Sequence, residues 1–156
     1  MAKDVWDNIL KHIQTISHPI FSTVNPPTTA EEINLLESTL NVQLPIHFRN
    51  YLSTWNGQQD HVPFIGYNSF LSIPAIIETW SMLNELFEDE EQVDWIEEDR
   101  INGISGQLFK YHPGMSYQEV IANSFEEFSH EILKRFQANQ FSFTDGVISF
   151  EDHYFV

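Results

Sequence analysis

The segment TTAEEINLLESTLNVQLPIHFRNYLSTWNGQ, residues 28–58, constrains the fold more than any other part of the chain. Thr28 and Thr29 are each followed three residues later by a glutamate, the spacing of the capping box that begins a helix. Apolar residues then recur at helical spacing up to Asn41, a residue type that tolerates the left-handed conformation found at helix ends. This pattern predicts an amphipathic helix whose apolar face is Ile33, Leu36 and Leu40, with Leu35 beside them.

A second amphipathic helix follows the Leu44-Pro45 pair. Pro45 suits the first turn of a helix, because its missing N–H needs no partner there. Asn56-Gly57 then supplies residues that accept a positive φ where a helix ends. The predicted apolar face of this second helix is Phe48, Tyr51, Leu52 and Trp55. No residue in the segment lies in a recognisable catalytic motif, which favours a folded binding protein over an enzyme.

The remaining patterns predict further helices and several strands. Helices are predicted at residues 4–17, 74–87 and 125–136, the first ended by His18-Pro19 and the last capped by Ser124 and Glu127. Strands are predicted at residues 62–65, 107–111 and 119–122, and a hairpin joins residues 141–143 to 147–150. Partly segregated helices and strands predict an α+β fold, with a small, mostly antiparallel sheet packed against four or so helices. The length fits a single domain, residues 1–156.

The order of several motifs resembles the SUKH superfamily, over roughly residues 26–135 of this chain. The first motifs are Pro-Pro, Thr-x-x-Glu-Ile, Leu-x-x-x-Leu-x-Val-x-Leu-Pro, Phe-Arg-x-x-Leu and Asn-Gly-Gln, and the later ones are residues 70–73 with Trp80, 106–109 and 120–128. The residues matched to the family motifs include Leu44, Pro45, Phe48, Asn56, Gly57, Gln58 and Trp80. The superfamily includes fungal Smi/Knr-type cell-wall synthesis regulators and many bacterial immunity proteins, so the resemblance implies a protein that works by binding.

The chain departs from the family pattern between Trp80 and Gln107. Family members usually carry a tryptophan-isoleucine-proline strand and a Gly-Asp-containing strand there. In this chain the region is short and strongly acidic, and only Trp95-Ile96 remains of those strands. The departure leaves open whether the chain keeps the groove that those strands form.

Charge restricts the kind of partner. The chain has 23 acidic residues against 7 Lys and Arg, for a net charge of −16, so nucleic acid and anionic membranes repel it. A basic protein would be attracted, although the acidity also keeps a protein soluble without any specific role. The absence of cysteine excludes disulfides and thiolate chemistry. With neither a signal peptide nor a membrane-spanning run in the sequence, we expect a cytoplasmic protein.

Residues 88–99 concentrate this charge, because eight of the twelve are acidic. Trp95 lies among them, where it is either an interface anchor or a residue that pins the acidic segment to the sheet. The predicted partner-binding residues are Glu88, Asp89, Glu90, Glu91, Asp94, Trp95, Glu97, Glu98 and Asp99.

Motifs for catalysis and metal binding are weak. The seven histidines lack zinc-site spacing. Asp60-His61 and Glu151-Asp152-His153 could ligate a metal, but such short groups are common by chance. No serine lies in a nucleophile elbow and no glycine-rich phosphate loop is present, so we expect no catalytic residue, metal or cofactor. Asn56-Gly57-Gln58 has two interpretations, a helix end whose side chains satisfy backbone groups or a polar patch at the mouth of a groove.

The resemblance thus implies a non-enzymatic immunity protein that neutralises a cognate toxin. The acidity of the chain favours a partner with a basic domain, such as a nuclease. The alternatives are a regulatory scaffold of the fungal type and an enzyme that uses carboxylates and a histidine. The enzyme would require a cleft in which a histidine and an acid converge.

Overall fold

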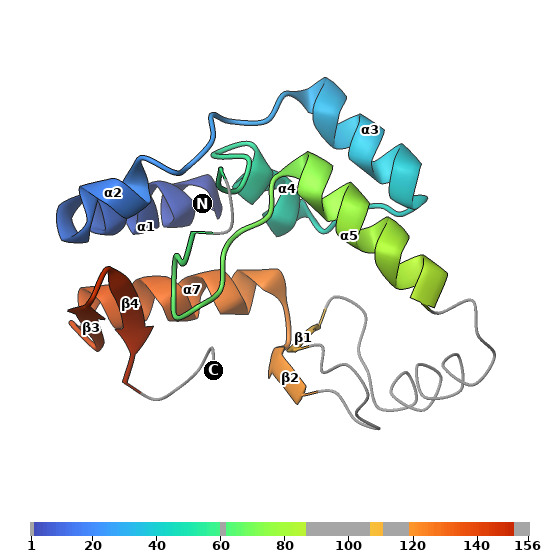
Figure 1. Cartoon of the computed structure of the whole chain (residues 1–156). Coiled ribbons are helices and arrows are strands. Elements are labelled where there is room, and N and C mark those ends of the chain that lie inside the picture. The colour runs from blue at the N-terminus through green and yellow to red at the C-terminus, as the bar shows by residue number, and fades with distance from the viewer. Residues whose placement is uncertain (1, 60–61, 87–106, 111–118, 152–156) are drawn as a thin grey trace.

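The computed structural model describes residues 2–59, 62–86, 107–110 and 119–151. Six helices are described: α1 (Ala2–Ile16), α2 (His18–Phe21), α3 (Ala30–Leu40), α4 (Ile46–Leu52), α5 (Ile73–Leu86) and α7 (Phe125–Gln137). Four strands are described: β1 (Leu108–Lys110), β2 (Glu119–Ala122), β3 (Phe141–Thr144) and β4 (Val147–Phe150). Figure 1 shows α1 lying above α7, with α3 and α5 extending side by side from the opposite end of the molecule. The α+β fold class is confirmed.

The strands form two separate antiparallel pairs within the described part of the chain. β1 pairs with β2, with an irregular register between Leu108 and Phe109. β3 pairs with β4 in regular register across a two-residue turn. The predicted strand at residues 62–65 is wrong, because Ile65 forms only an isolated bridge to Asn68. Gly66, at φ 59°, turns the chain back immediately after this apolar run.

Local capping chemistry explains where the helices begin and end. Thr29 Oγ1 accepts a hydrogen bond from the Glu32 amide at 3.2 Å, and a Glu32 carboxylate oxygen accepts one from the Thr29 amide at 2.8 Å, which completes the predicted capping box. Asn41 ends α3 at φ 53°, as predicted. Pro45 lies one position earlier than predicted, at the N-cap of α4. At α7 the Glu127 carboxylate accepts from the amide of Asn123, one residue before the N-cap.

Two predicted details differ. His18-Pro19 lies after the end of α1, as expected, but it also begins the short helix α2, capped by Ser17. Leu35 was expected beside the apolar face of α3, and it is instead 60% exposed. Its neighbours at helical spacing, Glu31, Ser38 and Thr39, are all exposed, so Leu35 belongs to the polar side of the helix.

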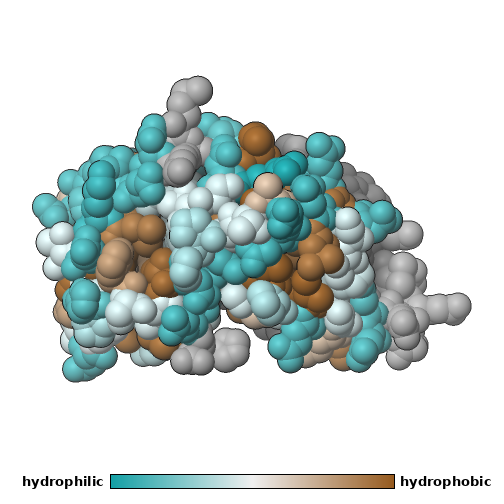
Figure 2. Space-filling view, turned by 90° about the horizontal axis from the view of Figure 1, so that it is seen from above, coloured by the Kyte–Doolittle hydropathy of each residue, from teal (hydrophilic) through white to brown (hydrophobic). Residues whose placement is uncertain are grey.

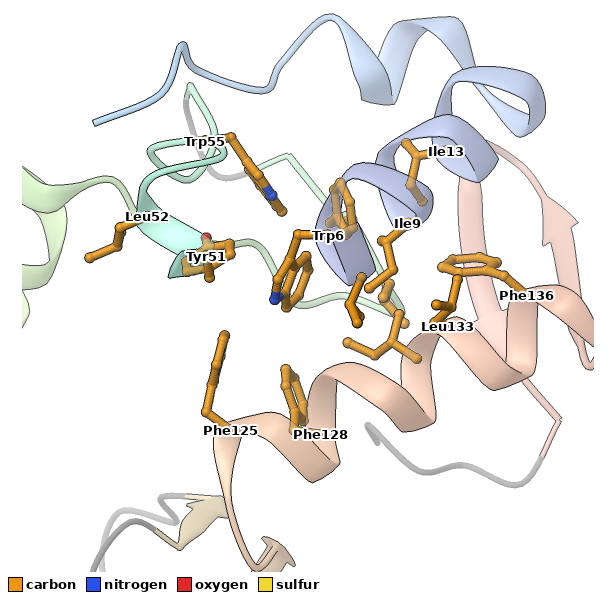
Figure 3. Close-up of a cluster of buried hydrophobic side chains, with 14 of the residues drawn as sticks. Trp6, Ile9, Ile13, Tyr51, Leu52, Trp55, Phe125, Phe128, Leu133 and Phe136 are labelled. Atoms are coloured by element: carbon orange, nitrogen blue, oxygen red, sulfur yellow. The ribbon is translucent and has the colours of Figure 1, made fainter. Parts of the chain in front are cut away.

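The core is centred on aromatic side chains from α1, α4 and α7. Trp6 is fully buried and lies within 5.7 Å, centroid to centroid, of Tyr51, Trp55 and Phe125 (Figure 3). Phe136 on α7 extends the core toward the β3–β4 hairpin, where it contacts Phe141 and Phe150. Aromatic pairs in such tilted, edge-to-face and stacked arrangements add to the stability gained from burying their surface. α1 therefore belongs to the same core as the helices of the 28–58 segment.

Candidate functional site

The motif Asn56-Gly57-Gln58 lies inside the fold. Gln58 is 4% exposed, and its side-chain amide donates to Thr23 Oγ1 and to the Val62 carbonyl, while its carbonyl oxygen accepts from the Phe70 amide at 2.8 Å. Asn56 Oδ1 accepts from the Ile73 amide at 2.8 Å, at the first turn of α5. These are the backbone-satisfying contacts of the structural interpretation, and the motif holds the start of α5 in place.

Gly57 occupies a position that only glycine fits. Its φ is 59°, and a Cβ atom added to it would lie 2.3 Å from the carbonyl carbon and oxygen of Leu71. The segments before α3, after α4 and before α5 meet here, because the Asn25 amide also donates to the Gly57 carbonyl at 2.9 Å. The motif is thus a junction of three segments rather than a groove mouth.

The other family-motif residues contribute to the core or to its margin. Phe48 contacts Tyr51 and Phe125, and Leu44 is half-buried against the core. Trp80 lies on α5 and is partly exposed. The predicted partner-binding residues Glu88, Asp89, Glu90, Glu91, Asp94, Trp95, Glu97, Glu98 and Asp99 lie outside the described residues.

Exposed hydrophobic side chains gather at the α3 and α5 end of the molecule. Within the described part of the chain, five of the eight large hydrophobic residues that are strongly exposed come from α3, the turn after it, the start of α4 and α5. We call this set the α3–α5 surface; it consists of Leu35, Val42, Ile46, Met82 and Leu86. Figure 2 shows hydrophobic patches among hydrophilic ones on this side of the molecule. Single exposed apolar residues are common on monomeric proteins, whereas large contiguous apolar patches mark interaction sites.

The same end of the molecule is poor in positive charge. Arg49 is the only Lys or Arg between Lys11 and Arg100. Its guanidinium lies 3.5 Å from the Glu37 carboxylate, which also accepts a hydrogen bond from the Leu44 amide at 3.0 Å. Glu31, Glu78 and Glu85 are exposed on α3 and α5. The α3–α5 surface therefore combines exposed apolar side chains with a negative field.

A shallow hollow of about 520 Å³ lies at the corner between α3 and α4. Its lining is almost entirely polar: Asn34, Glu37, Ser38, Asn41, Val42 and Gln43. Ligand sites are mostly apolar and enclose a few converging polar groups, so this hollow has the wrong lining for a small-molecule site.

One histidine–acid cluster is relevant to the enzyme alternative. Glu126 on α7 lies 3.1 Å from His47 Nε2 on α4 and 4.0 Å from His130 Nε2. The three side chains are between about a third and more than half exposed, and none of them lines the hollow at the α3–α4 corner. The three side chains form a partly exposed bridge between α4 and α7 at the surface.

No three His, Asp or Glu side chains within residues 2–59, 62–86, 107–110 and 119–151 are arranged to hold a metal ion. Over the same ranges, no helix has the length and apolar character needed to cross a membrane.

Sequence reasoning missed the α3–α5 surface, since it assigned every leucine of α3 to the core side. The available signal was the position of Leu35, whose neighbours at spacings of three and four are Glu31, Ser38 and Thr39.

Comparison with protein families gave a match over most of the chain. The model of the SMI1 / KNR4 family (SUKH-1) matches residues 27–131. Among curated proteins, none matched this chain. The matched range runs from the connector before α3 into α7, and so it contains the Asn56-Gly57-Gln58 junction and the whole α3–α5 surface.

Proposed function

Because this chain belongs to the SMI1 / KNR4 family (SUKH-1), we propose that it is a protein-binding domain that neutralises a basic toxin by direct contact. The observation that carries the proposal is the family match over residues 27–131, since this family includes immunity proteins. The exposed side chains and charge of the same region support a protein partner rather than a small substrate.

Binding would use two complementary features of this region. The α3–α5 surface offers exposed aliphatic side chains, which exclude water when a partner covers them. Its negative field, to which the acidic residues 88–99 add their charge, would attract a basic partner from a distance. Leu86, at the end of α5, lies only two positions before Glu88, so both features belong to one continuous stretch of sequence.

A nuclease toxin fits this charge pattern well. Its active-site groove binds phosphates and is therefore basic, and the carboxylates of residues 88–99 would occupy it as phosphate mimics. Trp95 would provide the apolar anchor within this acidic segment. Covering the groove blocks the nucleic-acid substrate without any bond chemistry by the immunity protein.

The proposal is tested by capturing the partner and then challenging cells with it. The chain is used at low salt to isolate proteins from its native host, and the captured protein is expressed with and without it. We expect the chain to restore growth. A double variant, Leu35→Ser with Ile46→Ser, should lose protection while remaining folded, because both side chains are about 60% exposed.

Val120→Ser on β2 provides the matched control, because Val120 is 49% exposed and its strand packs against β1 and α7. It should protect as the wild type does. A captured protein that is harmless to cells would contradict the proposal. Equal protection by the wild type, the double variant and Val120→Ser would contradict it as well. In the first case the regulatory scaffold of the fungal type becomes the better account.

A further inference from the structure

Among the described residues, the β3–β4 hairpin leaves one side of β3 without a paired strand. Asp145 and Gly146 form its two-residue turn, with φ values of 53° and 79°. Two consecutive positive φ values identify a type I′ turn, in which the residues on either side of the turn form a hydrogen-bonded pair. Thr144 and Val147 are that pair in the register of the two strands.

Hydrogen-bonded and non-hydrogen-bonded pairs alternate along an antiparallel ladder. Phe143 opposite Ile148 is therefore a non-hydrogen-bonded pair, and so is Phe141 opposite Phe150. An independent contact supports this assignment: the Ile148 carbonyl accepts a hydrogen bond from the Gly66 amide at 2.6 Å, so it points away from β3. The N–H and C=O groups of Phe143 and Phe141 point away from β4 by the same alternation.

The outer side of β3 is open and unprotected. In the sheet that the described residues form, β3 has β4 as its one neighbour, and Figure 1 shows the hairpin at an end of the molecule. β3 contains no charged residue, no proline and no bulge, which are the usual devices that prevent edge-to-edge pairing. Phe143 is 43% exposed, although it lies on the same face of the hairpin as the half-buried Phe141.

We propose that β3 pairs with β3 of a second copy of this chain, antiparallel and related by a two-fold axis through Ser142. The sequence Phe141-Ser142-Phe143 reads identically in both directions, so each phenylalanine meets the other phenylalanine of the second copy. Both residues present outward N–H and C=O groups, and this register therefore forms two hydrogen-bonded pairs with four backbone hydrogen bonds. The two hairpins become one four-stranded sheet.

This register also explains why a second copy is the better occupant than an unrelated strand. A two-fold interface requires a surface that is complementary to itself, and the outward groups of Phe141 and Phe143 are placed symmetrically about Ser142. Phe143, exposed in the single chain, would lie directly beside Phe141 of the second copy, where cross-strand aromatic pairs are favourable. An arbitrary strand would satisfy the backbone groups but not this aromatic pairing.

Charge sets the conditions under which the dimer forms. Each copy carries a net charge of −16, so the two repel each other at low ionic strength. Two short strands also bury less surface than a stable interface requires, so the dimer is weak. Added salt screens the repulsion and tightens the dimer, whereas it weakens capture of a basic partner. The two associations therefore have salt dependences of opposite sign, and either one can fail without the other.

The test is sedimentation equilibrium of the full chain up to about 1 mM protein, at low salt and at about 1 M salt. We expect a species of twice the 18.3 kDa chain mass that increases with protein concentration and with salt. Phe143→Lys adds a charge on the open edge and should weaken the dimer by roughly tenfold or more. Val120→Lys adds the same charge at a similarly exposed position on the other hairpin and should dimerise as the wild type does.

Phe143→Pro gives a second, milder variant. Its missing N–H points away from β4 in this register, so the hairpin should persist while one intermolecular hydrogen bond is lost on each copy. Circular dichroism checks that every variant is folded. A wild type that remains monomeric at the highest concentration and salt, or equal weakening by Phe143→Lys and Val120→Lys, would overturn the proposal.

Discussion

Trp6 Nε1 donates a hydrogen bond to Ser129 Oγ at 3.1 Å, joining two buried side chains that are 123 positions apart in the sequence. Ser129 Oγ in turn donates to the Phe125 carbonyl at 2.7 Å. The family match begins at residue 27, so α1 lies outside it, yet Trp6 is in the centre of the aromatic core. The fold of the matched region therefore depends on a helix that precedes it.

Replacing Trp6 tests that dependence. Trp6→Ala removes the ring contacts to α4 and α7 and should lower the free energy of unfolding by roughly 3–5 kcal/mol. Trp6→Phe keeps an aromatic ring and loses the hydrogen bond to Ser129, so it should cost less. Urea unfolding monitored by circular dichroism measures both values. Equal, small losses for the two variants would show that α1 contributes little to the core.

Two of the glycines with positive φ, Gly57 and Gly146, form a matched pair. Gly57→Ala should lose roughly 1–3 kcal/mol to backbone strain and a similar further amount to crowding, because the added Cβ would meet the Leu71 carbonyl. Gly146→Ala has the same type of strain, at φ 79°, but nothing lies within 4 Å of its added Cβ. Thermal unfolding should therefore rank Gly57→Ala as clearly the less stable variant, and the reverse order would refute the junction described above.

Replacing each of the two adjacent threonines before α3 by valine should change the stability of the protein in opposite directions. Thr29→Val removes the cap of α3 and should cost about 1 kcal/mol of stability. Thr28 Oγ1 is buried and has no hydrogen-bond partner in the structure, so Thr28→Val replaces an unsatisfied hydroxyl with a methyl group of similar size. It should raise stability by about 1 kcal/mol. Destabilisation by Thr28→Val would indicate that a hydrogen bond to this hydroxyl forms in solution.

Because Tyr51 is buried, we expect the stability of the protein to fall at alkaline pH. Burial raises the pKa of its hydroxyl well above the ordinary value of 10.0, so the folded protein keeps the proton at pH values where the unfolded chain loses it. Its contribution is fully present below pH 10 and declines above it, by about 1.4 kcal/mol per pH unit. We expect urea midpoints of the wild type to fall between about pH 10 and 11.5 more steeply than those of Tyr51→Phe. Parallel curves would show that the Tyr51 hydroxyl reaches solvent.

Features fixed by neighbouring residues could be predicted from the sequence. The Thr29–Glu32 capping box, the left-handed Asn41 and the turn at Asp145-Gly146 each depend on chemistry within a few positions. The burial of Gln58 could not be predicted, because it depends on Thr23, Val62 and Phe70 meeting at one point.

The candidate site was predictable only in part, for the same reason. The acidity of residues 88–99 is a property of composition and needs no fold. Exposure of Leu35 and Ile46 depends on which faces of α3 and α4 the rest of the molecule covers. Residues 62–65 show the opposite error, since a run of apolar residues that predicts a strand instead enters a tight turn at Gly66.

The most direct test of partner capture is its association rate constant as a function of salt, measured by stopped-flow with the captured protein. Glu97→Gln with Glu98→Gln removes two charges from the acidic segment, and Asp145→Asn with Glu151→Gln removes two exposed charges near the β3–β4 hairpin. We predict that the first variant binds more slowly at low salt with a shallower salt dependence, and that the second binds almost as the wild type does. Identical rates and salt slopes for all three proteins would contradict the account.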